Sequence, residues 1–544
     1  MTVQQHRGWI RHGGTRPSDY FVFNTDHKVI GIQYLVLSFA FFFFGGVLAE
    51  VIRTHLAVPS ANLVTSQTYN ELFTIHATVM IFLWIIPAFT GLGNFVVPLS
   101  IGANDMAFPK LNALSFWLLP PGAALLLLSF IVGGAESGWT AYPPLSLQTS
   151  TGQTLWAFSL QFIGFSTIFS AINFLVTIFN LRAPGMTLTR LPLLAWGMVA
   201  TSITIILGTP VLSGALAMLI LQRLLDTNFF APVAGGDPLM WQNLFWFYSH
   251  PAVYIMVLPA FGIMSEVIPV FARKPIFGYK MVAASSLAIG LFGFLVWAHH
   301  MFTSGMYPVL RIPFMITSMI IAVPTGVKIF SWLATIWAGK LRFPTANLFA
   351  LAFISLFVVG GLSGIFLASV PIDIHVQDTY FVVAHLHYVL FGGSVMAMYA
   401  GLYFWFPKIT GRMLDEKLGK LHFWMTFFGF NITFLPLHVV GLWGMPRRVA
   451  SYAPEFTLLN VVATLGSFLL AAGVLPLIVN VITSLLRGKV AGPNPWRALS
   501  LEWTVSSPPP IHNFTTPPVV TADPYGYGER PVPAPEPVPA GGGK

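Results

Sequence analysis

The chain lacks cysteine altogether and carries few charged residues. The absence of cysteine among its 544 residues excludes disulfides, thiolate zinc sites and any cysteine-ligated copper within this chain. Charged residues make up only 8% of the sequence, whereas hydrophobic residues make up 55%. No cleavable signal pattern precedes the first apolar run. This balance indicates a protein that lies in a membrane.

Long apolar runs recur along the chain, and each is long enough to cross roughly 30 Å of hydrocarbon. Proline and glycine interrupt many of them, which membrane helices tolerate. The runs predict an all-α, polytopic membrane protein with about twelve transmembrane helices, near residues 29–53, 75–101, 113–134, 157–180, 192–222, 244–270, 281–302, 314–339, 347–369, 380–407, 421–445 and 459–487.

The basic residues predict how these helices are oriented. If the N-terminus lies inside, 21 of the 27 lysines and arginines fall in inside segments and four in outside loops. The net charge of +9 is therefore a topology signal and does not favour nucleic-acid binding. We expect an inside N-terminal segment (1–28), a transmembrane domain (29–487) and an inside tail rich in proline and glycine (488–544), disordered from residue 505.

Eight histidines lie within the predicted spans. Two of them, His422 and His438, are interpreted as structural hydrogen-bonding residues, and the other six are candidate metal ligands. Imidazole is costly in hydrocarbon, so an intramembrane histidine indicates function, and imidazole binds both iron and copper. At 1.5 Å per residue, all six fall in roughly the outer third of the membrane. They are His76, His250, His299, His300, His385 and His387.

The spacing of these histidines limits what they can bind. His385 and His387 are two positions apart, about 200° around a helix, so they face opposite sides and cannot share one metal. They can bind two haems, one on each side of their helix, and His76 can supply a second axial ligand to one of them. The adjacent His299 and His300 need one ligand from another helix to complete a three-histidine metal site.

Several long motifs connect these histidines with a known family. The motifs are FTIHATVMIF (73–82), GNFVVPLSIGANDMAFPKLNALSFWLLPP (93–121), HPAVY (250–254), WAHHMFTSG (297–305), PTGVKIFSWLAT (324–335), DTYFVVAHLHYVL (378–390) and GMPRR (444–448). With them, residues 20–450 resemble subunit I of the haem–copper oxidases, the catalytic subunit of cytochrome c oxidase.

The resemblance implies two haems, expected to be of the a type, and one copper ion. The implied ligands are His76 and His387 for a six-coordinate low-spin haem, His385 for the oxygen-binding haem, and His250, His299 and His300 for copper.

Four further residues are implied to act beside these groups. Tyr254 is expected to be bonded to His250 and to supply an electron and a proton as the O–O bond cleaves; their i, i+4 spacing places both on one helix face. Arg53 is implied to hydrogen-bond a substituent of the low-spin haem. Arg447 and Arg448 are implied to pair with haem propionates.

Two proton routes from the inside are also implied. Lys328 lies near mid-membrane, where an amine is costly unless it is paired or functional. With Thr325 and Ser265 it resembles the lysine channel that leads to Tyr254. The second route resembles the aspartate channel, which begins at Asp105 and is lined by Asn94, Asn112, Asn173, Ser166 and Thr167.

Two positions depart from the commonest family pattern. Many members carry glutamate two residues after the copper-ligating histidine of helix 6, where this chain has Ala252 preceded by Tyr248 and Ser249. The chain therefore resembles the subgroup in which tyrosine and serine replace that glutamate. Gln377 stands where many members have histidine, which leaves Asp378 as a candidate magnesium ligand with a weaker neighbour.

The implied function is that of a terminal respiratory oxidase. By this resemblance, the protein is expected to reduce oxygen to water with electrons from cytochrome c or a similar donor, and to couple this reaction to proton pumping across a bacterial-type energy-transducing membrane. Because this chain has no cysteine, the two-copper entry centre must belong to a separate subunit II. Subunit III is a further expected partner.

Three alternative functions fit the sequence less well than that of a cytochrome c oxidase. Quinol oxidases carry arginine and aspartate at positions that correspond to Phe44 and Leu48, which favours a cytochrome c-type donor. Nitric oxide reductases lack the tyrosine and the lysine channel, so Tyr254 and Lys328 argue against that class. A purely structural or transport role leaves six aligned histidines unexplained.

Overall fold

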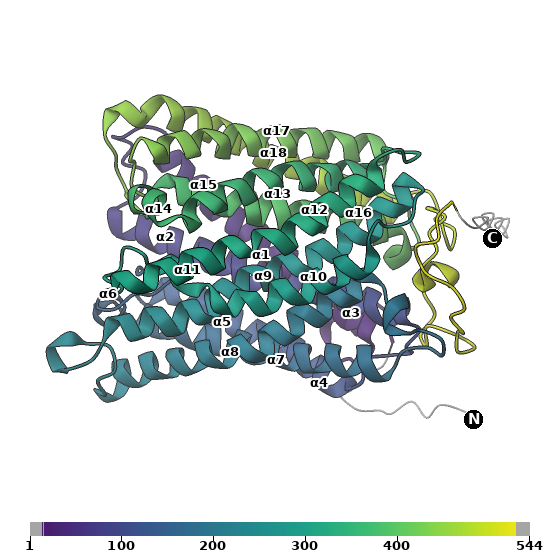
Figure 1. The fold of residues 1–544 in the computed structure, drawn as a ribbon. Coiled ribbons are helices and arrows are strands. Elements are labelled where there is room, and N and C mark those ends of the chain that lie inside the picture. Colours follow the sequence, from purple (N-terminus) through teal and green to yellow (C-terminus); the bar gives the residue numbers. More distant parts are fainter. Residues whose placement is uncertain (1–12, 15, 529–544) are drawn as a thin grey trace.

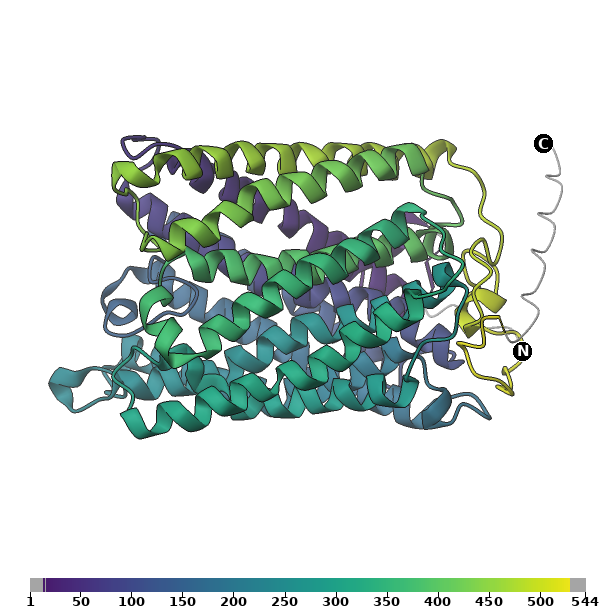
Figure 2. The same cartoon turned by 45° about the horizontal axis from the view of Figure 1, so that its top comes forward.

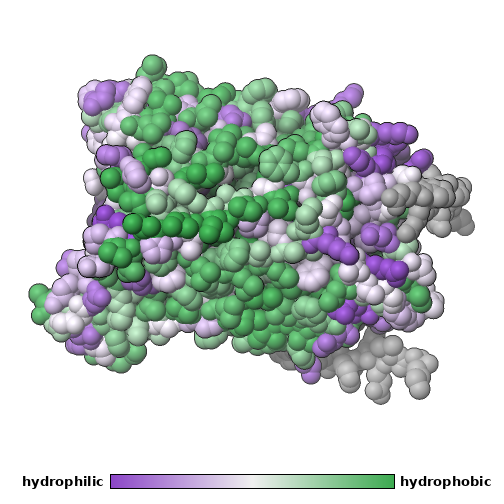
Figure 3. Space-filling view, viewed as in Figure 1, coloured by the Kyte–Doolittle hydropathy of each residue, from purple (hydrophilic) through white to green (hydrophobic). Residues whose placement is uncertain are grey.

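The computed structural model describes residues 13, 14 and 16–528. Residues 1–12, 15 and 529–544, which belong to the predicted N-terminal segment and tail, lie outside the described residues. The described part is a bundle of long helices that run side by side, and it contains no β-strand (Figure 1). Apolar side chains cover the middle of the bundle and hydrophilic ones gather toward both ends (Figure 3). This is the surface expected of a protein that spans a bilayer.

The predicted number of spans is confirmed. Eleven helical segments of the described chain are long and apolar enough to cross a membrane, and the shorter apolar helix Tyr279–Leu295 makes the twelfth. The spans comprise α1 (His27–His55), α2–η2–α3 (Ser66–Val79, Met80–Ile85, Ile86–Ile101), α4–α5 (Pro109–Trp117, Leu119–Ile131), α7 (Thr151–Asn180), α8 (Leu193–Leu225), α9 (Pro238–Ala272), α10–η5 (Tyr279–Phe292, Gly293–Leu295), α11–α12 (Pro308–Ile320, Ala322–Ile336), α13 (Thr345–Ala368), α15–η7–α16 (Tyr380–Val389, Leu390–Val395, Met396–Thr410), α17 (Glu416–Leu442) and α18 (Thr457–Arg487).

Short helical segments precede, connect and follow these spans. They are η1 (Pro17–Phe21), α6 (Leu145–Gln148), η3 (Leu188–Arg190), η4 (Pro232–Ala234), η6 (Trp297–Met301), α14 (Val370–Val376), η8 (Pro454–Phe456) and η9 (Leu501–Thr504). Among the spans, α9 lies at the centre. All residues of its 18-residue apolar stretch are buried, as expected for a helix that is hydrophobic all round. Only 11% of the corresponding stretch of α11–α12 is buried, so this segment lies at the edge of the bundle.

Two predicted helix boundaries near the histidines are wrong. The helix that carries His76 begins at Ser66 and is capped by the Thr65 side chain, so His76 lies well inside it and does not open it. Its first turns are polar, and the apolar run alone did not reveal them. The span expected over 281–302 is helical only to Phe292, after which the chain continues in 3₁₀ turns, and His299 and His300 lie on η6.

The expectation of a disordered tail from residue 505 is also wrong for the described residues. Residues 488–528 fold over the end of the bundle that also carries residues 16–26, and we call this end the tail face (Figure 2). The Val520 N–H donates to the Pro184 carbonyl at 2.9 Å, and the Tyr525 hydroxyl donates to the Glu266 carboxylate at 2.5 Å. Proline and glycine keep this segment from forming helices, but contacts with the bundle fix it nonetheless.

A glycine sets the closest approach between two helices of the bundle. A Cβ atom added at Gly441 of α17 would lie 1.9 Å from the backbone nitrogen of Phe381 in α15. Backbone atoms cannot rotate away as a side chain can. This glycine therefore lets α17 pack against the helix that carries His385 and His387.

We expect Gly441→Ala to destabilise the protein by about 3 kcal/mol, the upper end of the usual cost of overpacking. Thermal unfolding of the purified protein measures this. Gly214→Ala in α8 is the matched control, because a Cβ there meets no atom within 4 Å. Equal unfolding temperatures for the two variants would contradict the packing argument.

Candidate functional site

Three histidines form a cluster suited to one metal ion. One nitrogen from each of His250, His299 and His300 lies within 4.8 Å of the other two, and no other group of three or more histidines, aspartates and glutamates in the described chain meets that criterion. His250 Nδ1 and His300 Nε2 are 3.2 Å apart. The 3₁₀ turn η6 allows two adjacent histidines to face the same point, which consecutive α-helical positions do not favour. The predicted three-histidine site is therefore assembled by α9 and η6.

Neighbouring side chains fix the imidazoles of this cluster. The His300 ring stacks on Trp246 with 3.8 Å between ring centroids. His299 Nδ1 lies 2.8 Å from the Ser318 hydroxyl, whose own hydrogen goes to the Phe314 carbonyl. Ser318 must then accept from His299, which leaves Nε2 of His299 with its lone pair for a metal. Such outer partners orient ligands and fix their tautomers.

His76 and His387 line one apolar cavity of about 610 Å³ between α1, α2, α15 and α18. His76 Nδ1 donates to the Gly45 carbonyl at 2.8 Å, and His387 Nδ1 donates to the Val383 carbonyl at 2.8 Å. Both rings therefore keep a free Nε2. This arrangement fits a haem held between two axial imidazoles.

His385 belongs to a different environment. Its Nδ1 lies 3.0 Å from the Gly360 carbonyl and 3.0 Å from the Ser363 hydroxyl, both on α13. His387 instead stacks on Phe434 of α17, with ring centroids 4.1 Å apart. The two histidines thus face different neighbours, in agreement with their spacing. A Cβ added at Gly364 would lie 2.9 Å from the His385 ring, so glycine leaves room beside this imidazole.

A π-helical turn follows each histidine that lines the cavity. The turn η2 (Met80–Ile85) comes shortly after His76, and η7 (Leu390–Val395) comes shortly after His387. Residues of both turns line the same cavity. π turns widen a helix locally and are frequent at functional sites.

Arg53, in the last turn of α1, has buried guanidinium donors. Its Nη2 contacts the Asn460 carbonyl at 3.1 Å and the Thr464 hydroxyl at 3.2 Å. Its Nε and Nη1 are buried and have no hydrogen-bond partner among the described residues. Unpaired buried guanidinium donors are costly, and they fit an acceptor supplied by a bound group such as a haem substituent.

Charged side chains gather at the end of the bundle opposite the tail face. Arg447 Nε donates to the Asp378 carboxylate at 2.8 Å. Although burial acts to raise it, the pKa of Asp378 lies below its usual value because of the Arg447 guanidinium. Burial lowers the pKa of Arg448 to about 10, so a nearby anion would stabilise this residue. Asp373, which the sequence reasoning missed, is buried nearby, and burial raises the pKa of its carboxyl to about 7.

The candidate magnesium position has little support from its surroundings. Asp378 is paired with Arg447, and Gln377 Nε2 points to the His300 carbonyl at 3.5 Å. No group of three or more histidines, aspartates and glutamates in the described chain includes Asp378.

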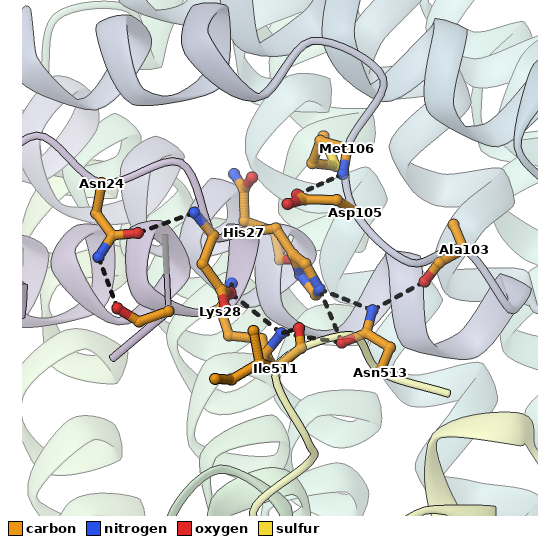
Figure 4. Close-up of polar contacts among 11 residues, drawn as sticks. Asn24, His27, Lys28, Ala103, Asp105, Met106, Ile511 and Asn513 are labelled. Carbon is orange, nitrogen blue, oxygen red and sulfur yellow. Dashed lines mark hydrogen bonds and ion pairs between the residues drawn. The ribbon is translucent and has the colours of Figure 1, made fainter. Parts of the chain in front are cut away.

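Asp105 lies at the tail face beside the start of α1 (Figure 4). The Met106 N–H donates to its carboxylate at 2.7 Å. Burial raises the pKa of Asp105 to about 7, so its carboxyl can both take up and release a proton near neutral pH. Asn513 of the tail closes one side of this region: its Nδ2 contacts His27 at 2.8 Å and the Ala103 carbonyl at 2.8 Å, and its Oδ1 accepts from Lys28 at 3.0 Å (Figure 4).

The polar side chains predicted to line the aspartate route have different surroundings. Asn94 Oδ1 and both amide ends of Asn112 are buried without a partner among the described residues, so they suit bound water. Asn173 instead binds the Phe108 backbone through two hydrogen bonds. Thr167 donates to the Gly164 carbonyl of its own helix at 2.9 Å, and no contact with the rest of the route is seen.

Tyr34 is the centre of a hydroxyl cluster that the sequence reasoning missed. Its hydroxyl lies 2.9 Å from Ser115, 3.1 Å from Ser170 and 3.4 Å from the predicted Ser166. The signal available in the sequence was a tyrosine within the first apolar run. Ser170 also lines a narrow cavity toward α8, beside Thr201 and Ser202, whose hydroxyls have no partner among the described residues.

Tyr248 and Ser249 lie on α9. The Tyr248 ring stacks on Phe82 with centroids 6.4 Å apart. Ser249 and Ala252 line the large cavity that holds His76 and His387. The Ser249 hydroxyl is buried and has no partner among the described residues, so it is available to water.

The predicted lysine route is less contiguous than expected. Lys328 is 1% exposed, and its Nζ contacts Val282 and Ser286 of α10. Thr325 donates to the Ile321 carbonyl of its own helix at 3.0 Å. Ser265 accepts from the Trp332 indole at 3.0 Å and does not contact Lys328. Tyr254 does lie beside His250, with ring centroids 4.8 Å apart.

Comparison with known proteins connects this arrangement with one family. Residues 29–469 match the family model described as cytochrome c and quinol oxidase polypeptide I. The chain is 56% identical to a cytochrome c oxidase subunit 1 of Synechocystis sp. over 97% of this chain and 96% of that protein. It is 57% identical to the corresponding protein of Thermostichus vulcanus, covering 94% and 93% of the two chains.

A more distant relative and a solved structure agree. The chain is 48% identical to a cytochrome c oxidase subunit 1 of Bacillus subtilis over 94% of this chain and 83% of that protein. A cryo-EM structure of a haem–copper terminal oxidase dimer superposes with a TM-score of 0.75 over 85% of each chain at 20% identity, which supports the fold.

We expect the purified protein to bind one copper ion at the three-histidine cluster, and His300→Ala to weaken that binding by at least about 100-fold, the upper end of what loss of an outer-shell partner costs. Metal analysis and a metal titration measure this. His375→Ala, at an exposed histidine of α14, is the matched control. Full copper retention in His300→Ala would contradict the site.

Proposed function

Because the chain belongs to the family of cytochrome c and quinol oxidase polypeptide I, we propose in detail how its residues carry out the reaction of that family. The chain is the catalytic subunit of a haem–copper terminal oxidase that reduces oxygen with electrons from cytochrome c. The observation that carries this function is the identity of 56% over nearly the full length of both chains. The quinol oxidase and nitric oxide reductase alternatives have no comparable support.

We assign the cofactors to the histidines by their free nitrogens. His76 and His387 would hold a low-spin haem through their Nε2 atoms, since both Nδ1 atoms donate to carbonyls. His385 would hold a second haem, and His250, His299 and His300 would hold copper. When bound, these groups supply electron transfer and the reduction of oxygen. The haems are proposed to be of the a type.

Tyr254 is proposed to supply a proton and an electron during oxygen reduction. Its ring lies 4.8 Å from that of His250, and His250 Nε2 has no partner among the described residues. That nitrogen is therefore available for the covalent bond that the family resemblance implies. Lys328 is proposed to replace the proton that Tyr254 gives up, with Thr325 and Ser265 along the way.

The partners follow from what this chain lacks. It has no cysteine, so electrons from cytochrome c must enter through the two-copper centre of a separate subunit II. Subunit III is proposed as a further partner in the same membrane. The basic residues favour an orientation with the tail face inside, and Arg447 and Arg448 would then face haem propionates at the outer side. A magnesium ion at Asp378 would have to compete with Arg447 for its carboxylate.

A donor assay tests the proposed electron source. We expect the purified complex to consume oxygen with reduced cytochrome c at a turnover within the ~1–1,000 s⁻¹ typical of enzymes, and not with quinol alone. Haem extraction from the same sample identifies the two haems. Oxygen uptake with quinol and none with cytochrome c would instead assign the chain to the quinol oxidases.

Protons for pumping are proposed to enter at Asp105 and to pass the Tyr34 cluster. From there, hydroxyls without partners on α8 lead water toward Tyr248 and Ser249. Ala252 can neither carry a proton nor order water, so Tyr248 is proposed to replace the family's glutamate as a neutral hydroxyl. A phenol has a reference pKa near 10, which makes the anion costly as a resting state.

We expect Tyr248→Phe to lower turnover roughly tenfold, less than the ~100-fold of a lost general acid, because water can partly replace the hydroxyl. Proton release after an oxygen pulse from reconstituted vesicles should fall as well, with haem spectra unchanged. Asp105→Asn is the positive control, and Tyr403→Phe, at another buried tyrosine, is the negative control. Parent-like pumping in Tyr248→Phe would rule out the hydroxyl as the relay.

A further inference from the structure

The Lys328 ammonium group contacts α10, a helix that carries none of the residues predicted for the lysine route. Its Nζ donates to the Val282 carbonyl at 2.9 Å and to the Ser286 hydroxyl at 2.7 Å. The Phe261 ring centroid lies 5.4 Å from the same nitrogen, within cation–π range. Because a lysine ammonium has three donors, two oxygens and one aromatic face can satisfy all of them.

This environment supports the protonated amine without a counter-ion. Lys328 is 1% exposed, and no carboxylate in the described chain forms an ion pair with it. A buried charge without an ion partner depends on its hydrogen bonds. The Ser286 hydroxyl donates its own hydrogen to the Val282 carbonyl at 3.2 Å, so its lone pairs are left to accept from Lys328. Ser286 is thus an acceptor aimed at the ammonium group.

The docked position lies at a distance from the residue that must receive the proton. Tyr254 packs beside Gly293, where an added Cβ would lie 2.9 Å from its ring. Gly293 follows Ser286 by seven residues, which is about 10 Å along a helix. The amine must therefore leave Ser286, or pass its proton to water, before Tyr254 can be reprotonated.

We propose that Ser286 is a positioning residue of the lysine route: it docks Lys328 in its protonated form between successive deliveries to Tyr254. The inference rests on the proposed role of Lys328 in proton delivery. It assigns to α10 a part in a route that otherwise consists of residues from α9 and α12.

The neighbouring Ser285 offers a matched control. Ser285 and Ser286 are both buried, at 5% and 3% exposure, and both donate to the Val282 carbonyl. Of the two serines, only Ser286 forms a hydrogen bond with Lys328. Loss of either hydroxyl removes one local hydrogen bond in α10, but only loss of Ser286 removes an acceptor from the ammonium group.

The experiment uses the purified oxidase complex with Ser286→Ala, Ser285→Ala, Ser286→Thr and Lys328→Met. Stopped-flow spectra follow reduction of the oxygen-binding haem without oxygen, and a flash experiment follows its oxidation by oxygen in the fully reduced enzyme. We expect Ser286→Ala to slow reduction about tenfold, as loss of a hydrogen bond to a charged group does, and to leave oxidation unchanged. Ser285→Ala and Ser286→Thr should reduce at nearly the parent rate.

The outcomes separate this inference from the role of Lys328. If Lys328→Met slows reduction and Ser286→Ala does not, the docking role is wrong and the lysine route stands. Equal slowing in Ser285→Ala and Ser286→Ala would also overturn it, because packing of α10 would then be the cause. If Lys328→Met reduces at the parent rate, the proposed lysine route fails, and the role of Ser286 fails with it.

Discussion

The structure depends on one constraint: inside a membrane, a polar atom must find its partner within the protein. Four of the six candidate ligand imidazoles meet it in the same way. His76, His385 and His387 each direct Nδ1 to a backbone carbonyl, and His299 directs it to a serine hydroxyl. That single bond fixes the tautomer and the orientation of the ring. It also leaves Nε2 as the only nitrogen that can bind a metal. The hydrogen bond made by Nδ1 therefore makes Nε2 available as a ligand.

Departures from the α-helix are concentrated where these rings must be placed. Two π turns follow the histidines of the large cavity, and 3₁₀ turns carry the adjacent pair His299 and His300. α-Helices form most of the remainder of the bundle, and Gly441 allows the close contact between α17 and α15. The π turns within the spans thus lie next to candidate ligand histidines.

Much of this arrangement could be predicted from the sequence, because hydropathy and histidine spacing are local properties. The twelve spans and the three-histidine cluster follow from them, and so do the different environments of His385 and His387. The start of α2 was missed because its first turns, from Ser66 onward, are polar. The fixed tail and the Tyr34 cluster could not be predicted, since they depend on partners far apart in the chain. The role of Ser265 stays a prediction: it lies on α9, and its hydroxyl accepts from the Trp332 indole.

The contact between Asn513 and the start of α1 has a consequence for biosynthesis. Asn513 joins His27, Lys28 and Ala103, which are translated hundreds of residues earlier. The wall beside Asp105 is therefore completed only after the last helix has left the ribosome and the tail has folded back. Until then, the proposed proton inlet at Asp105 is incomplete in the nascent chain. Because Asn513 is translated last of these residues, this proposed inlet is completed only after the transmembrane helices have been inserted.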